Sequence, residues 1–190
     1  MDEQTLRNIR DRTDAKLRYA RIHFEELEQA GYGGSDFERA HLESCLFHLI
    51  GARDAFLAEL LQYYGFQKTE NLTLGKVREL LATKNRRSTE IAELYLLEND
   101  QAGSWYSDMK KFRDHVAHNG PAAHHFSLHI GGGNAQPGEP EIQLPFVDEK
   151  PVTTSPRFTR SDALRTWHEE MAQLLGRLRE NAIQTNNLLG

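Results

Sequence analysis

Apolar residues recur every three or four positions along most of the chain, a spacing typical of amphipathic α-helices. Ser35 followed by Glu38 forms a capping box that marks the start of one helix, and Asn119-Gly120-Pro121 marks the end of another. The pattern predicts an all-α fold, a bundle of about five to six helices in a single domain over residues 1–190. The predicted helices cover residues 4–30, 35–64, 73–83, 88–98, 104–118 and, starting from Thr159 or Ser161, about 160–186.

The helix predicted over residues 35–64 has apolar residues on two sides, which is typical of a helix at the centre of a bundle. One of these sides is rich in small residues, and we expect this small-residue stripe to lie in the core. Cys45 has apolar neighbours on the same helix, so we expect a buried thiol and not a nucleophile. The small-residue stripe consists of Phe37, Ala40, Ser44, Phe47, Gly51, Ala55 and Ala58.

A different pattern follows the fifth predicted helix. Residues 126–130 and 141–147 alternate apolar side chains with others, as the strands of a hairpin do. The stretch between them, GGGNAQPGEP, is rich in turn-forming residues. We therefore expect a small β-hairpin insert at about 124–155, before the last helix.

The composition is that of an ordinary globular protein, and it limits the classes of function that the chain can have. Hydrophobic residues make up 38% of the chain and charged residues 27%, with no apolar run long enough to span a membrane. The first residues are charged and contain no apolar signal segment, so we expect a cytoplasmic protein. The net charge of -5 argues against binding nucleic acid with the whole surface, so any polyanion site must be local.

Residues 111–120, KFRDHVAHNG, combine a helix end with a cluster of ionisable side chains. Arg113 stands five residues before His118, with His115 between them. Cations at the C-terminal end of a helix are favourable by themselves, so one interpretation is simple charge complementation. A second is catalytic, because an arginine fork can hold a phosphate while a histidine moves the proton of a ribose hydroxyl. Together the two groups suffice for metal-free RNA cleavage, which leaves a cyclic phosphate.

A metal site is a third interpretation of the same region, because five of the nine histidines are close together in sequence. No Asp or Glu completes an HExxH-like set there, which disfavours the metal. The chain also lacks the GxSxG motif, which disfavours a hydrolase triad, and it lacks the Walker A and GxGxxG motifs, which excludes a phosphate-cradling loop. The five histidines are His115, His118, His124, His125 and His129.

The segment from Arg113 to His118, at the end of a helix in an all-helical bundle, resembles the R-x4-6-H motif of HEPN domains. HEPN proteins are small, commonly dimeric helical bundles, and many are metal-independent ribonucleases of toxin–antitoxin pairs and phage defence. The resemblance implies an endoribonuclease that acts on RNA without a cofactor or metal, with an antitoxin or regulatory protein as a possible partner. Arg18 and His23 have the same spacing, but they lie in the middle of the first predicted helix.

The resemblance also implies a role for each residue of the motif. Arg113 would bind and polarise the phosphate, His118 would be the acid and base, and Asp114 would orient one of them. His115 would be an auxiliary polar group, predicted to bind substrate together with Lys110 and Lys111, which lie next to the motif.

The spacing within the motif favours a dimer. Two residues five positions apart point roughly 140° apart around a helix, so one copy of the motif does not surround a phosphate by itself. A twofold axis would bring two arginines and two histidines into one cleft. The alternative is a non-catalytic helical module, in which the same residues cap the end of the helix and bind a nucleotide or a protein partner.

Overall fold

The computed structural model describes residues 3–30, 36–67, 72–99, 104–118 and 160–187. These ranges contain helices and no strand, so the all-α prediction is confirmed for them, and each helix bound lies within one residue of the predicted position. The hairpin predicted at about 124–155 lies outside the described residues and stays a prediction. The six helices in the described ranges are α1 (Glu3–Ala30), α2 (Asp36–Tyr63), α3 (Leu74–Thr83), α4 (Thr89–Asn99), α5 (Trp105–His118) and α6 (Arg160–Asn187).

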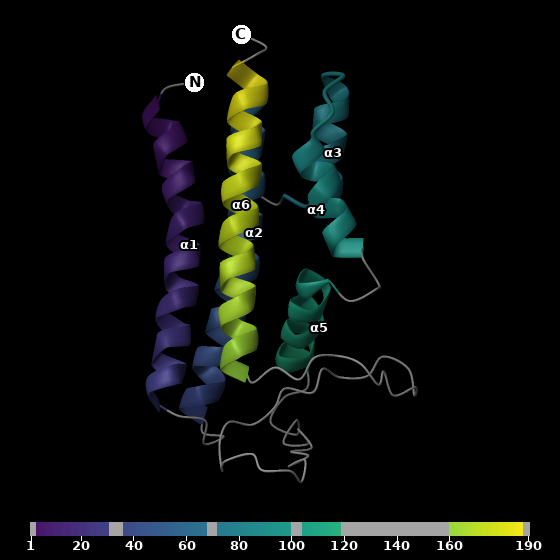
Figure 1. Cartoon of the computed structure of the whole chain (residues 1–190). Coiled ribbons are helices and arrows are strands. Elements are labelled where there is room, and N and C mark those ends of the chain that lie inside the picture. Colours follow the sequence, from purple (N-terminus) through teal and green to yellow (C-terminus); the bar gives the residue numbers. More distant parts are fainter. Residues whose placement is uncertain (1–2, 31–35, 68–71, 100–103, 119–159, 188–190) are drawn as a thin grey trace.

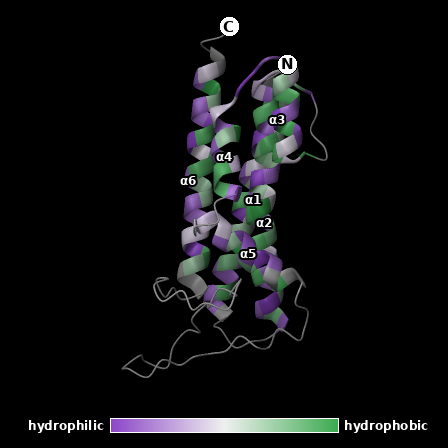
Figure 2. Ribbon diagram, turned by 90° about the vertical axis from the view of Figure 1, so that its right-hand side faces the viewer, coloured by the Kyte–Doolittle hydropathy of each residue, from purple (hydrophilic) through white to green (hydrophobic). Residues whose placement is uncertain are grey.

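Helix α2 is the central element of the bundle. Figure 1 shows α1, α2 and α6 running side by side, with α3, α4 and α5 on the other side of α2 and α6 from α1. Helix α2 packs against α1, α3, α5 and α6, while α4 packs against α3, α5 and α6. Hydrophobic and hydrophilic residues alternate along each helix in Figure 2, as expected for helices that bury one side. The end of α5 and the start of α6 lie at the same end of the bundle as the end of α1 (Figure 1).

The burial of α2 changes along its length. Every residue from 55 to 62 is buried, which confirms the predicted central position for this half of the helix. The prediction that the whole small-residue stripe lies in the core is wrong, because Phe37 is 48% exposed and Phe47 is 64% exposed. Helical periodicity places these residues on one side of α2, and the described part of the chain leaves the first half of that side uncovered. Only Ala55 and Ala58 of the stripe are buried.

A buried network of charged side chains ties the three long helices together. Arg179 of α6 donates two hydrogen bonds to the carboxylate of Glu59 in α2, at 2.5 and 3.0 Å, and a third to Asp14 of α1 at 2.9 Å. The hydroxyl of Tyr63 donates to the same carboxylate at 3.0 Å. Glu59 is 0% exposed, so its charge is compensated by protein groups alone. Burial raises the pKa of Tyr63, and the adjacent Glu59 carboxylate adds to this rise.

Cys45 is buried in α2, as predicted. Burial raises the pKa of its thiol to about 12, so the thiol is protonated at neutral pH and is a poor nucleophile.

Among the helices that the structure describes, none has the length and apolar character needed to cross a membrane.

Candidate active site

Helix α5 positions the motif through one buried face. The helix starts at a serine cap, in which the Ser104 hydroxyl accepts a hydrogen bond from the backbone N–H of Ser107 at 3.2 Å. Its buried apolar residues recur every three or four positions and face the core: Tyr106, Met109, Phe112 and Val116. This packing leaves the predicted site residues Lys110, Lys111, Arg113 and Asp114 half-buried at the sides of the helix.

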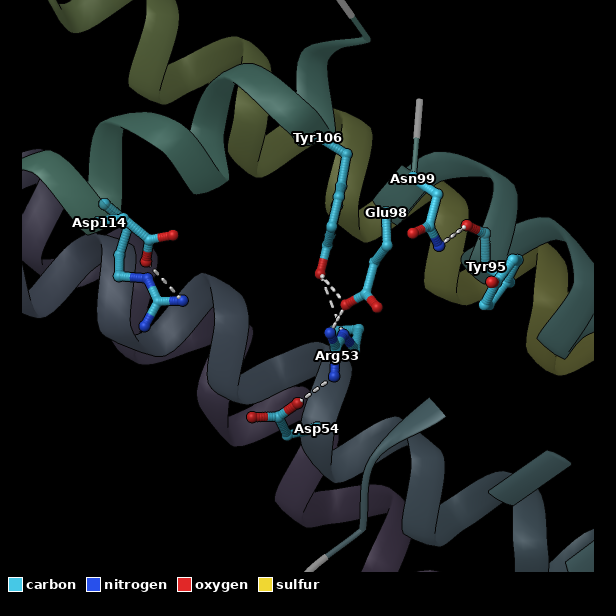
Figure 3. Close-up of polar contacts among 8 residues, drawn as sticks. Arg53, Asp54, Tyr95, Glu98, Asn99, Tyr106 and Asp114 are labelled. Atoms are coloured by element: carbon cyan, nitrogen blue, oxygen red, sulfur yellow. Dashed lines mark hydrogen bonds and ion pairs between the residues drawn. The ribbon is translucent and has the colours of Figure 1, made fainter. Parts of the chain in front are cut away.

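Arg113 forms an ion pair with Asp114, its neighbour in sequence, at 2.9 Å (Figure 3). The Arg113 side chain is 37% exposed, yet its Nε is buried and has no hydrogen-bond partner among the described residues. A buried donor without a partner is unusual. The exposed part of the guanidinium, and not the buried Nε, is the part that can donate hydrogen bonds to an anionic ligand. The structure therefore places two of the predicted catalytic residues in contact, with the arginine partly accessible.

A second polar cluster fixes the start of α5 against α2 and α4. Arg53 of α2 donates from Nε to the hydroxyl of Tyr106 at 3.0 Å, and it forms an ion pair with Glu98 of α4 (Figure 3). The Tyr106 hydroxyl in turn donates to Glu98 at 3.3 Å, and Arg53 also pairs with Asp54 at 2.5 Å. This Arg53 cluster, made of Arg53, Asp54, Glu98 and Tyr106, links the first turn of α5 to α2 and α4.

The positive charge of Arg113 acts on Tyr106, a member of this cluster. Burial raises the pKa of Tyr106, and the positive charges of Arg53 and Arg113 both oppose that rise. Tyr106 and Arg113 are seven residues apart and so lie on the same side of α5. Sequence reasoning missed the Arg53 cluster because its members come from three helices, and no local spacing links them.

His118 is the last residue of α5, which confirms the predicted helix end. The side chains of His115 and His118 and all of residues 119–159 lie outside the description. The pairing of Arg113 with His118 and the role of His115 therefore stay predictions. In the described part of the chain, no three His, Cys, Asp or Glu side chains are arranged to hold a metal ion.

The second pair with the same spacing, Arg18 and His23, has a different setting. Both lie in the middle of α1, and Arg18 is exposed. His23 faces α2, where its Nδ1 lies 3.2 Å from Nδ1 of His41 and its ring stacks on His48 with centroids 5.5 Å apart. The Nδ1 of His48 lies 3.5 Å from the ammonium of Lys16. This α1–α2 histidine cluster, made of Lys16, His23, His41 and His48, was not predicted, because its partners come from two helices.

The histidine cluster gives the protein an expected dependence of stability on pH. Burial, then the neighbouring His41, lowers the pKa of His23, and burial, then Lys16, lowers the pKa of His48. The unfolded chain then binds more protons than the folded chain below pH 6.5. Stability is therefore full above pH 6.5 and falls as the pH drops from 6.5 through the folded pKa values.

This expectation can be checked by urea unfolding of the wild type and of a His23→Gln/His48→Gln variant at pH 7.5 and 5.0. We expect the wild type to lose more free energy of unfolding than the variant between these two pH values. An equal loss in both proteins would show that the two histidines do not contribute.

Comparisons of the chain with family models, curated proteins and solved structures gave no match. The geometry of the site is therefore the basis for assigning a function.

Proposed function

We propose that the protein is a metal-independent endoribonuclease of the HEPN type, with Arg113 and His118 at the centre of its active site. The observation that carries the proposal is the state of Arg113 near the end of α5. Its guanidinium is half-buried and, among the described residues, it pairs with Asp114 while its buried Nε has no partner. Five residues later the helix ends at a histidine, which can transfer a proton near neutral pH.

The proposed reaction is an attack of a ribose hydroxyl on the neighbouring phosphate. The guanidinium of Arg113 binds the non-bridging oxygens and stabilises the negative charge that grows in the transition state. His118 accepts the proton of the 2′-hydroxyl, and the 2′-oxygen forms a bond to phosphorus. The bond from phosphorus to the 5′-oxygen breaks. His118, which is now an imidazolium, gives its proton to this leaving oxygen. The products are a 2′,3′-cyclic phosphate and a 5′-hydroxyl.

Neighbouring residues have supporting roles in this proposal. Asp114 holds one terminal nitrogen of Arg113 at 2.9 Å and leaves the other terminal nitrogen for phosphate oxygens. Lys110 lies one turn before Arg113, and Lys111 lies two turns before position 118, so both can contact the RNA backbone on either side of the scissile phosphate. His115 would bind substrate between them.

The active unit would be a homodimer. Position 118 is rotated by roughly 140° from Arg113 around α5, so a second copy would supply the opposite wall of the cleft. An enzyme that cuts cellular RNA in the cytoplasm is toxic unless it is controlled. A toxin–antitoxin or phage-defence setting, with an antitoxin or other regulatory protein as partner, would provide that control.

The proposal is tested by incubating the purified protein with total cellular RNA in EDTA and determining the product ends. We expect cleavage that leaves cyclic phosphates, and no cleavage by an Arg113→Ala/His118→Ala variant prepared in parallel, which controls for contaminating nuclease. A folded wild type that binds RNA without cutting it would contradict the enzyme and favour the non-catalytic binding module.

A further inference from the structure

We propose that His23 of α1 and His41 of α2 form a two-histidine chelate for a divalent transition metal, with Zn²⁺ as the reference ion. The site would link the two helices of the α1–α2 hairpin. It uses no residue of α5, and it is independent of the ribonuclease proposed above, which uses no metal.

The distance between the two ring nitrogens is the first argument. The Nδ1 atoms of His23 and His41 lie 3.2 Å apart. In a tetrahedral zinc site with Zn–N bonds of about 2.0–2.1 Å, two imidazole nitrogens are separated by about 3.3 Å. The two side chains therefore already have a separation close to that which a tetrahedral ion requires, and both present the same ring atom.

The protonation of the pair is the second argument. Without a metal, one Nδ1 must carry a hydrogen and donate it to the lone pair of the other. A metal instead needs both lone pairs, and each neutral ring provides its own when its hydrogen is on Nε2.

The surroundings hold the pair in place. The ring of Phe37 packs on His41 with centroids 4.1 Å apart, and the ring of His48 stacks on His23 at 5.5 Å. These ring contacts restrict the rotation of both imidazoles. The charge of Glu26 acts on His23 and favours a cation there, whereas the ammonium of Lys16, 3.5 Å from Nδ1 of His48, is a positive charge in the same cluster and opposes one.

The described residues supply two ligands and no arranged group of three. Water would therefore take the remaining positions, and the ion would exchange with solvent. Imidazole ligands suit Zn²⁺, Ni²⁺ and Cu²⁺, and among these Cu²⁺ is expected to bind most tightly. Mg²⁺ and Ca²⁺, which require oxygen ligands, are expected not to bind this pair.

The test is a calorimetric titration of the whole chain with ZnCl₂ at pH 7.5. The chain has 9 histidines, so the informative quantity is the difference between variants. We expect His23→Gln and His41→Gln each to bind one equivalent of Zn²⁺ less than the wild type. His168→Gln is the matched control, because His168 is a half-buried histidine whose Nε2 lies 3.2 Å from the carbonyl of Leu17, and it should retain the full stoichiometry.

A second measurement keeps the proposal testable if a glutamine variant folds poorly. In NMR spectra of the wild type, Zn²⁺ should shift the imidazole resonances of His23 and His41 and leave that of His168 unchanged. The proposal is overturned if those two resonances do not move at saturating Zn²⁺, or if a folded His41→Gln protein binds as many equivalents as the wild type. The RNA assay contains EDTA, so neither result bears on the proposed ribonuclease.

Discussion

Replacing His118 with alanine is expected to lower the rate of metal-free RNA cleavage by about 10²–10⁴-fold, the usual effect of removing a general acid or base. The bundle should stay folded, because His118 is the last residue of α5 and no helix continues beyond it in the described chain. A charged histidine at a helix end contributes about 1 kcal/mol or less, so the free energy of unfolding should change little. Single-turnover cleavage of a labelled RNA, with urea unfolding of the same samples, measures both quantities.

Variants of Arg113 separate charge from geometry at the same site. Arg113→Ala should reduce cleavage by about 10²–10³-fold, as for other groups that stabilise transition-state charge. Arg113→Lys keeps the positive charge but loses the planar fork, so it should fall between alanine and the wild type. Arg18→Ala is the matched control, because Arg18 has the same spacing to a histidine but lies in the middle of α1. Wild-type activity in folded His118→Ala would rule out the proposed mechanism.

The dimer can be tested with the same proteins. Arg113→Ala and His118→Ala are each expected to cleave RNA far more slowly than the wild type, but a mixed dimer has one intact arginine and one intact histidine in the shared cleft. Mixing the two variants and allowing subunits to exchange should therefore restore part of the activity. A mixture with the activity of the separate variants, in which mixed dimers are shown to form, would point to active sites confined to single chains.

The second large effect is expected on stability, at the buried Arg179 network. Arg179→Met should lower the free energy of unfolding by about 3–5 kcal/mol, because it leaves the carboxylate of Glu59 buried without its cationic partner. Tyr63 would still donate one hydrogen bond to that carboxylate, but a hydroxyl does not compensate its charge. Urea unfolding at pH 7.5 measures the loss.

Two controls isolate the buried charge as the cause. Arg177 lies two residues earlier on α6, is 56% exposed and pairs with Glu93 at 2.7 Å, so Arg177→Met should cost about 0–1 kcal/mol. Adding Glu59→Gln to Arg179→Met removes the unpaired buried charge, so it should recover much of the lost free energy of unfolding. Similar losses for Arg177→Met and Arg179→Met would mean that the network adds no more than a surface pair.

The helices could be predicted from the sequence because their signals are local. The three-to-four spacing of apolar residues, the capping box at Ser35 and the stop after His118 all act within a few residues, and the helix bounds agree with them. The small-residue stripe on α2 shows what local signals cannot predict. Periodicity identified one side of the helix, but the exposure of Phe37 and Phe47 depends on which other helices pack there.

The candidate site could be predicted in part, for the same reason. Arg113 and Asp114 are neighbours in sequence, and their contact follows from their position on one helix. The contact of Arg53 with Tyr106 joins residues 53 positions apart, and that of Arg179 with Asp14 joins residues 165 positions apart. Such pairs arise from the packing of whole helices, and nothing in the local pattern distinguishes them from charges that face solvent.

The Arg179 network also determines how far α6 can slide along the hairpin of α1 and α2. A shift of one helical turn moves a side chain by about 5.4 Å. The guanidinium would then be out of reach of Glu59, and both charges would lose their partner. The register of α6 is therefore fixed by side chains within the bundle, not by the length of the connection that precedes it. Insertions or deletions between α5 and α6 can change that connection and leave the helix in the same place.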